Sequence, residues 1–139
     1  MIVLKTAKEL ETMKEACRIS AGALRVAKEV LEVGVSTAYV DDKVREYILS
    51  QGATPTCLNY EGFPKSTCIS INEQVIHGIP SKNTIVKQGD IVSVDLCASY
   101  GGFVGDNAAT FGVGRVSDEA QRLMDVTKQS LMEALKVAY

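Results

Sequence analysis

The stretch that decides the fold is Ile91-Val-Ser-Val-Asp-Leu-Cys-Ala-Ser-Tyr-Gly-Gly-Phe-Val-Gly-Asp106. Apolar and polar residues alternate before a Tyr-Gly-Gly turn, which predicts an antiparallel β-hairpin. A turn at Tyr100-Gly101 places Asp95 directly opposite Asp106, whereas a turn at Gly101-Gly102 makes them diagonal neighbours. In either register the two side chains lie on the same face, because side chains alternate along a strand.

The two aspartates of this hairpin form a candidate metal site. Like charges that face each other destabilise a sheet, so the pair favours a cation between them. Carboxylates are ligands that hard divalent metals prefer, and Asp95 and Asp106 could hold one or two such ions. The alternative is a pair of surface carboxylates on a solvated face. The apolar run Ile91–Val94 and the small residues after Asp106 favour the metal site.

The composition indicates one soluble globular domain over residues 1–139. Hydrophobic residues make up 46% and charged residues 23% of the chain, which is usual for such a domain. The net charge of −2 gives no basic surplus for nucleic acid binding. Apolar stretches are too short to span a membrane, and no signal segment opens the chain, so we expect a cytoplasmic location.

The four cysteines lack the Cys-x-x-Cys spacing of a zinc or redox motif. Reduced thiols that pack as small apolar groups are the favoured interpretation. A disulfide between Cys57 and Cys68 is a less favoured alternative.

Helical patterns flank a region of strands and loops. A capping box at Thr6–Glu9 predicts a long helix, and Ser36 or Thr37 opens a second helix that ends before Gly52. The first helix is expected to bury Leu10, Met13, Cys17, Ser20, Leu24, Ala27 and Leu31, and the second Val40, Val44, Tyr47 and Ile48. Cys68–Asn72 reads as a strand, and Gln74–His77 as the start of another. The predicted fold class is α+β, an antiparallel sheet with helices packed on one face.

A last helix begins at Ser117, and its apolar stripe continues to the end of the chain without a C-cap. We therefore expect the chain to be a fragment or half of a larger fold. The alternative is a simple C-terminal helix that frays in solvent.

Two further features could carry chemistry. His77 is the only histidine, and Gly78 and Pro80 place it where strand gives way to loop, a position typical of catalytic groups; a hydrogen-bonded structural histidine is the alternative. The loop that contains Cys57, Tyr60, Phe63 and Cys68 could form an apolar pocket for a side chain. Ordinary anchoring of the loop by its aromatic residues is the alternative.

Five motifs together resemble the type I methionine aminopeptidases, in order and over essentially the whole chain. They are Tyr60-Glu-Gly-Phe-Pro-Lys-Ser66, Cys68-Ile-Ser-Ile-Asn-Glu73, Val75-Ile-His-Gly-Ile-Pro80, Gly89-Asp-Ile-Val-Ser-Val-Asp95 and Gly105-Asp-Asn-Ala-Ala-Thr-Phe111. The resemblance implies half of a pita-bread fold, built in that family from two pseudo-symmetric α+β halves. It also implies metal-dependent removal of the N-terminal methionine from nascent polypeptides.

The resemblance assigns roles residue by residue. Asp95 and Asp106 match two ligands of a pair of divalent ions (cobalt, manganese, iron or zinc) that activate a water molecule. His77 matches a histidine that contacts the substrate at the scissile amide. The residues that match the pocket for the methionine side chain are Cys57, Tyr60, Phe63 and Cys68.

Two departures from the family pattern are informative. Glu61 stands where many bacterial members have a histidine, which could change contacts at the pocket rim. The resemblance covers only the family's N-terminal half, so one histidine ligand, two glutamate ligands and a second catalytic histidine are missing. We therefore expect weak metal affinity and negligible turnover for this chain alone, with a self-associating homodimer or a non-catalytic peptide-binding module as alternatives.

Overall fold

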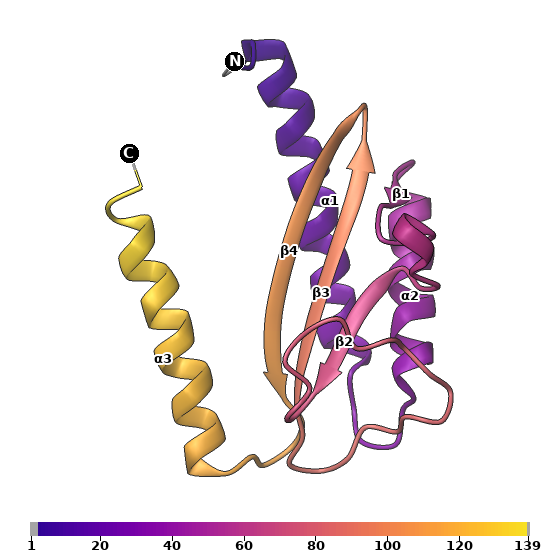
Figure 1. Cartoon of the computed structure of the whole chain (residues 1–139), viewed down its shortest axis with the longest axis vertical. Helices are drawn as coiled ribbons and strands as arrows, with labels where there is room; N and C mark the ends of the chain where they lie inside the picture. Colours follow the sequence, from indigo (N-terminus) through magenta and orange to yellow (C-terminus); the bar gives the residue numbers. More distant parts are fainter. Residues whose placement is uncertain (1–2, 139) are drawn as a thin grey trace.

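The computed structural model describes residues 3–138, which form an antiparallel sheet with two long helices on one face and a third helix apart from it (Figure 1). In chain order the elements are α1 (Ala7–Val30), α2 (Thr37–Ser50), β1 (Thr54–Pro55), the 3-10 turn η1 (Tyr60–Gly62), β2 (Thr67–Ile71), β3 (Ile91–Tyr100), β4 (Phe103–Gly112) and α3 (Asp118–Leu135). The predicted α+β class with an antiparallel sheet is confirmed.

Strand β3 is the centre of the sheet. It pairs along its whole length with β4, and its other edge pairs with β2 and then with β1, all antiparallel. The hairpin closes with Tyr100 opposite Phe103, and the intervening Gly101 and Gly102 have φ of 55° and 83°. Glycine adopts positive φ at little cost, so a Gly-Gly pair suits a two-residue hairpin turn.

Helix α1 begins with the predicted capping box. The backbone N–H of Thr6 donates to Glu9 Oε2 at 2.7 Å, and the backbone N–H of Glu9 donates to Thr6 Oγ1 at 3.3 Å. The buried face differs from the predicted one. Its buried residues are Ala16, Ile19, Ser20, Gly22, Ala23 and Ala27, whereas Leu10 and Cys17 of the predicted stripe are exposed.

The reason for this difference is the close approach of α1 to β4. A Cβ atom added to Gly105 of β4 would overlap the backbone of Ala16. At this point of contact only a small side chain fits between helix and strand, which suits Ala16. Ile19, one turn further along, is also buried.

Helix α2 matches its prediction. Ser36 caps it by accepting a hydrogen bond from the backbone N–H of Tyr39 at 3.2 Å. Val40, Val44 and Ile48 are fully buried, and this spacing gives one apolar stripe toward the sheet.

The core lies between these two helices and one face of the sheet. Val92, Val94, Leu96 and Ala98 alternate along β3, and all four are 0% exposed. Full burial of a side chain such as leucine or valine contributes roughly 1.5–3 kcal/mol each. The intervening residues of β3 lie on the opposite face, which neither α1 nor α2 covers, and we call this the open face.

Helix α3 is capped by Ser117 as predicted, since its Oγ accepts from the backbone N–H of Ala120 at 3.1 Å. The helix has no buried residue between Asp118 and Leu135, and Leu123 and Leu131 are each 59% exposed. Among the described residues, none of the helices has the length and apolar character needed to cross a membrane.

Candidate metal centre on the open face of the sheet

Asp95 and Asp106 lie on the open face as diagonal neighbours. Asp95 pairs with Ala108 and Asp106 pairs with Cys97, which is the register of a Gly101-Gly102 turn. Asp95 is half-buried and Asp106 is exposed. The sequence predicted the shared face in both registers, and the structure selects the diagonal arrangement.

The electrostatics of this pair favour a cation. The pKa of Asp95 is raised above its ordinary value of 3.8, first because burial penalises its charge and then because the Asp106 carboxylate repels it; His77 acts in the opposite direction. A partly buried carboxylate beside a second carboxylate gains stability when a cation neutralises the two charges. Two carboxylates are donors that hard divalent ions accept, so the residues present fit such an ion as part of its ligand set.

Strand β4 holds Asp106 through the residues on both sides of it. Gly105 is buried and packs against the backbone of Ala16. Asn107 donates a hydrogen bond from Nδ2 to Ser20 Oγ at 2.6 Å, and Ser20 is itself fully buried. Both neighbours of Asp106 are therefore fixed to α1, while its own side chain points to the open face.

Thiols surround the two aspartates. Cys68 of β2 lies opposite Asp95, and burial first, then Cys57 and Asp95, raises the pKa of its thiol to about 11. Burial first, then Cys57 and Asp106, raises the pKa of the Cys97 thiol to about 12. All four cysteines are free, so the less favoured Cys57–Cys68 disulfide does not occur in this structure.

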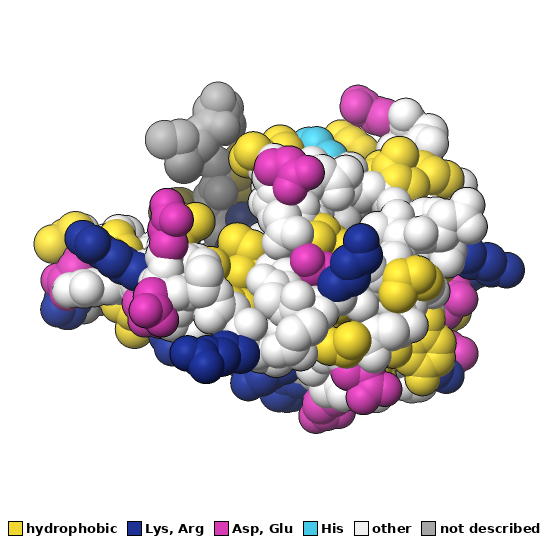
Figure 2. Space-filling view, turned by 90° about the horizontal axis from the view of Figure 1, so that it is seen from below, with side chains coloured by type: hydrophobic (Ala, Val, Ile, Leu, Met, Phe, Trp, Pro, Cys, Tyr) yellow, Lys and Arg dark blue, Asp and Glu magenta, His cyan; other side chains and the backbone are white. Residues whose placement is uncertain are grey.

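His77 lies on an exposed loop and not at the end of a strand, so the predicted strand at Gln74–His77 is wrong. Its backbone is left-handed, with φ of 56°. The next residue, Gly78, donates from its N–H to the hydroxyl of Ser70 at 3.0 Å, so the loop runs along β2. His77 also contributes to lowering the pKa of Asp95. Figure 2 shows the histidine in cyan at the surface beside hydrophobic side chains, and nearby Ile76 and Ile79 are 65% and 56% exposed.

The four residues predicted to line a pocket are not equally placed. Cys68 is buried, Cys57 and Phe63 are half-buried, and Tyr60 is 66% exposed. Cys68 pairs with Asp95 across the β2–β3 ladder. The residue before Cys57, Thr56, donates from its backbone N–H to the Cys97 carbonyl at 3.0 Å, which places Cys57 near Cys97. Tyr60 stands in the η1 turn at the outside of the loop.

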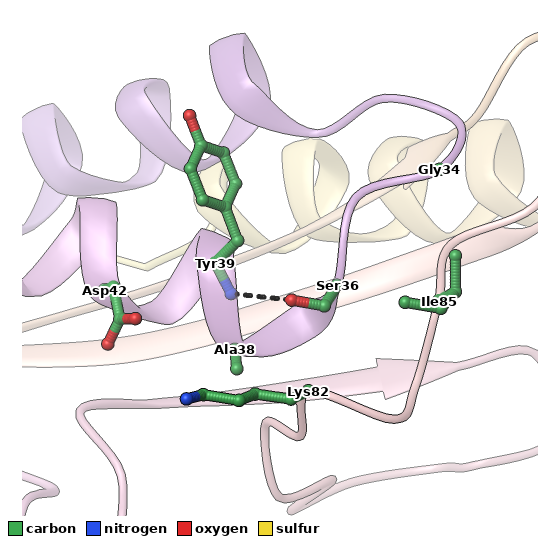
Figure 3. A pocket seen from close by; sticks show the side chains of 7 residues that line it. All are labelled: Gly34, Ser36, Ala38, Tyr39, Asp42, Lys82 and Ile85. Atoms are coloured by element: carbon green, nitrogen blue, oxygen red, sulfur yellow. Dashed lines mark hydrogen bonds between the residues drawn. The ribbon is translucent and has the colours of Figure 1, made fainter.

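Two shallow hollows lie away from the aspartates. One, of about 440 Å³, lies between the start of α2 and the segment around Lys82 and Ile85, with Tyr39 and Asp42 at its wall (Figure 3). The other, of about 460 Å³, is lined by residues that include Asn72 and Asp90. Neither hollow is lined by the predicted pocket residues.

A buried carboxylate that the sequence analysis missed anchors the loop before β2. Asp41 of α2 is 2% exposed. Its Oδ1 accepts hydrogen bonds from the backbone N–H groups of Ser66 and Thr67 at 3.0 and 2.9 Å and from Thr67 Oγ1 at 2.9 Å. The sequence carries only a partial sign of this, because Asp41 lies close to Val40 and Val44 on the helix, while the backbone groups that it binds are 25 residues away.

The part of the chain that the structure describes contains no group of three or more His, Cys, Asp or Glu side chains arranged to hold a metal ion. The open face therefore offers two carboxylates and leaves further coordination positions to other donors.

Comparisons with known proteins show the family of this chain. Residues 11–139 match the metallopeptidase family M24, and the chain belongs to this family. It is 42% identical over 138 residues to the methionine aminopeptidase of Clostridium acetobutylicum, covering 99% of this chain and 55% of that protein. It is 44% identical over 132 residues to methionine aminopeptidase 2 of Mycobacterium tuberculosis, covering 95% and 46%.

The fold comparison gives the same result. The crystal structure of methionine aminopeptidase from Thermotoga maritima matches with a TM-score of 0.95 and 39% identity, over 99% of this chain and 55% of that one. The chain thus spans about half the length of the relatives it matches. The predicted resemblance to the methionine aminopeptidases is confirmed, as is the predicted half of their pita-bread fold.

Proposed function

We propose that this chain forms part of the active site of a metal-dependent aminopeptidase that removes the N-terminal methionine from nascent polypeptides in the cytoplasm. The single observation that supports this most strongly is the diagonal pair Asp95 and Asp106 on the open face. Homologues that are methionine aminopeptidases supply the reaction class.

In this proposal each residue has a distinct task. Asp95 and Asp106 are two ligands of a site for two divalent ions, of cobalt, manganese, iron or zinc. Such ions, when bound, would polarise the scissile carbonyl and lower the pKa of water, so that hydroxide would be available as the nucleophile near neutral pH. His77 donates a hydrogen bond to the substrate amide and orients it over the aspartates.

The substrate side chain is bound by the loop that precedes β2 and by β2 itself. Cys57, Phe63 and Cys68 offer sulfur and aromatic surface to the methionine thioether, which such surfaces bind favourably. Tyr60 would have to turn inward when the peptide binds, because it is 66% exposed. Glu61 adds a negative charge at the rim of the pocket, close to where the peptide enters.

The test of the metal site is titration of the purified chain with Mn²⁺ by isothermal calorimetry. We expect weak binding, because two carboxylates leave most coordination positions to water, and we expect Asp95→Asn or Asp106→Asn to abolish it. Asp118→Asn, which removes an exposed carboxylate from α3, is the matched control and should leave it unchanged. Unchanged Mn²⁺ affinity in both open-face variants would refute the assignment of these ligands.

The expectation on activity has its own test. With a Met-Ala-Ser peptide and added Mn²⁺ or Co²⁺, we expect the chain alone to release negligible free methionine, because the open face supplies two carboxylates and leaves most coordination positions to water. Rapid, metal-dependent release of methionine by the 139-residue chain would show that these two carboxylates suffice.

A homodimer is a second candidate state, favoured by the exposed apolar side chains of α3. Leu123, Val126 and Leu131 are 59%, 52% and 59% exposed, and exposed apolar surface of this kind drives association. Sedimentation equilibrium that shows a strict monomer at high protein concentration would remove this candidate. A non-catalytic peptide-binding module is the remaining alternative, and it requires no metal response from Asp95 or Asp106.

A further inference from the structure

The loop that carries His77 holds this residue in an unfavourable backbone conformation. His77 is the only histidine of the chain, and its φ of 56° lies in the left-handed region. Residues with a Cβ atom are uncommon in this region, although histidine occurs there more often than most, and contacts around such a residue help to hold it there. Contacts on either side of His77 fix the loop beside the aspartates.

The next residue, Gly78, is hydrogen-bonded to strand β2 through both its carbonyl and its N–H. Its carbonyl accepts a hydrogen bond from the backbone N–H of Ile69 at 2.9 Å. Its own N–H donates to the hydroxyl of Ser70 at 3.0 Å. Gly78 is buried, and a Cβ atom added to it would overlap the Ile69 carbonyl, so the loop lies directly against β2.

The hydroxyl that receives this bond belongs to the floor of the candidate site. Ser70 is 3% exposed and pairs with Ser93 across the β2–β3 ladder. Cys68, two residues earlier, pairs with Asp95, and residues two apart in a strand share a face. Ser70 therefore points to the same open face as Asp95.

The start of the loop has a separate anchor. Asn72 has φ of 54°, donates from Nδ2 to Asp90 at 2.9 Å and accepts on Oδ1 from the backbone N–H of Ile91 at 3.0 Å. Between the two anchors, Val75 and Ile76 are 85% and 65% exposed. His77 lies next to the second anchor, which consists of the Ser70–Gly78 bond and the Ile69–Gly78 backbone bond. Of these two bonds, only the first depends on a side chain and can be removed by substitution.

We propose that Ser70 is a positioning residue, whose hydroxyl accepts the Gly78 N–H and so holds His77 beside Asp95 on the open face. The functional importance of this position rests on the proposed function, in which His77 contacts the substrate. The geometry that carries it is independent of any bound metal or peptide. A neutral hydrogen bond of this kind favours the anchored loop about fivefold over a released one.

The test is NMR spectroscopy of the whole chain labelled with 15N and 13C. A single histidine gives one set of ring signals, so His77 is read without ambiguity. Ser70→Ala removes the acceptor, and Ser70→Thr keeps a hydroxyl. Ser93→Ala is the matched control, because the Ser93 hydroxyl bonds Thr110 at 2.8 Å and not the loop.

In Ser70→Ala we expect the Gly78 amide to exchange with deuterium about fivefold faster. We also expect the ring of His77 to lose its nuclear Overhauser contacts to the open face. Ser70→Thr should restore both, and Ser93→Ala should change neither. A Ser70→Ala chain that loses stability in urea but keeps the contacts of His77 would overturn the positioning role, as would unchanged exchange at Gly78.

This outcome is separable from the proposed function. The spectra are recorded without metal or peptide, so failure of Mn²⁺ binding leaves the positioning of His77 intact. Conversely, Asp95→Asn could lose Mn²⁺ binding while the contacts of His77 stay unchanged in Ser70→Ala. That combination would refute the positioning role of Ser70 and support the metal site.

Discussion

Replacing Asp41 by alanine removes the acceptor of three hydrogen bonds inside the fold. Two of the donors are backbone N–H groups, those of Ser66 and Thr67, and the third is the Thr67 hydroxyl. Each buried donor left without a partner costs about 1–3 kcal/mol. Part of this loss is recovered because the desolvated charge of Asp41 disappears, so we expect a net destabilisation of about 3 kcal/mol.

The assay is urea denaturation followed by far-UV circular dichroism at neutral pH. Asp41→Asn is the informative partner variant, since its amide oxygen can still accept the three bonds, and we expect it to cost about 1 kcal/mol or less. Asp42→Ala changes the exposed neighbour in the same helix and should stay within about 0.5 kcal/mol of wild type. An Asp41→Ala chain as stable as Asp42→Ala would refute the anchoring role.

The pH dependence of stability gives the same reasoning a second test. Burial raises the pKa of Asp41 above its ordinary 3.8, although its hydrogen bonds and Lys65 act in the opposite direction. A carboxyl with a raised folded-state pKa binds protons more tightly when folded, so its contribution to stability falls as pH rises through that window. Asp41→Asn removes this component, so its stability relative to wild type should increase between about pH 4 and pH 7. A decrease in the stability of Asp41→Asn relative to wild type over that pH range would contradict the raised pKa of Asp41.

Two further predictions concern packing and thiol reactivity. Gly105→Ala should destabilise the chain by about 2–3 kcal/mol in urea, because the added methyl overlaps the backbone of Ala16 and pushes β4 away from α1; a loss below about 0.5 kcal/mol would show that the contact yields easily. In a brief pulse of iodoacetamide at about pH 8, followed by mass spectrometry, we expect the exposed Cys17 to be labelled and Cys68 and Cys97 to remain unlabelled. The reason is that burial raises the thiol pKa of Cys68 to about 11 and that of Cys97 to about 12, so almost no reactive thiolate is present at these two residues. Equal labelling of Cys17 and Cys97 would contradict this.

The hairpin was predictable from the sequence, and its register was narrowed to two alternatives. Alternation in residues 91–100 has a period of two, which only a half-buried strand explains. The choice between the two registers depends on the turn, and both central residues of the favoured hairpin turn have positive φ. Gly101 and Gly102 tolerate that conformation, whereas Tyr100 would be strained, so turn chemistry favours the diagonal pair that the structure shows.

The errors have physical causes that a single sequence conceals. Val75 and Ile76 have the composition of a strand, yet Asn72 turns the chain out of the sheet by bonding Asp90 and Ile91. These partners are distant in sequence, so local propensity could not reveal them. Asp41 was overlooked for a related reason, because a carboxylate in a helix is normally a surface residue, and its burial depends on the backbone of a loop 25 residues away.

The attachment of Gly105 and Asn107 to α1 has a consequence for how the hairpin could change during evolution. The position of β4 is fixed by contacts with α1 at the two residues beside Asp106, and not only by the turn. We therefore expect a lengthened tip between Tyr100 and Phe103 to bulge into solvent while the spacing of the two aspartates stays the same. Selection could then vary the tip in length and composition, and the separation of the two carboxylates would be inherited unchanged.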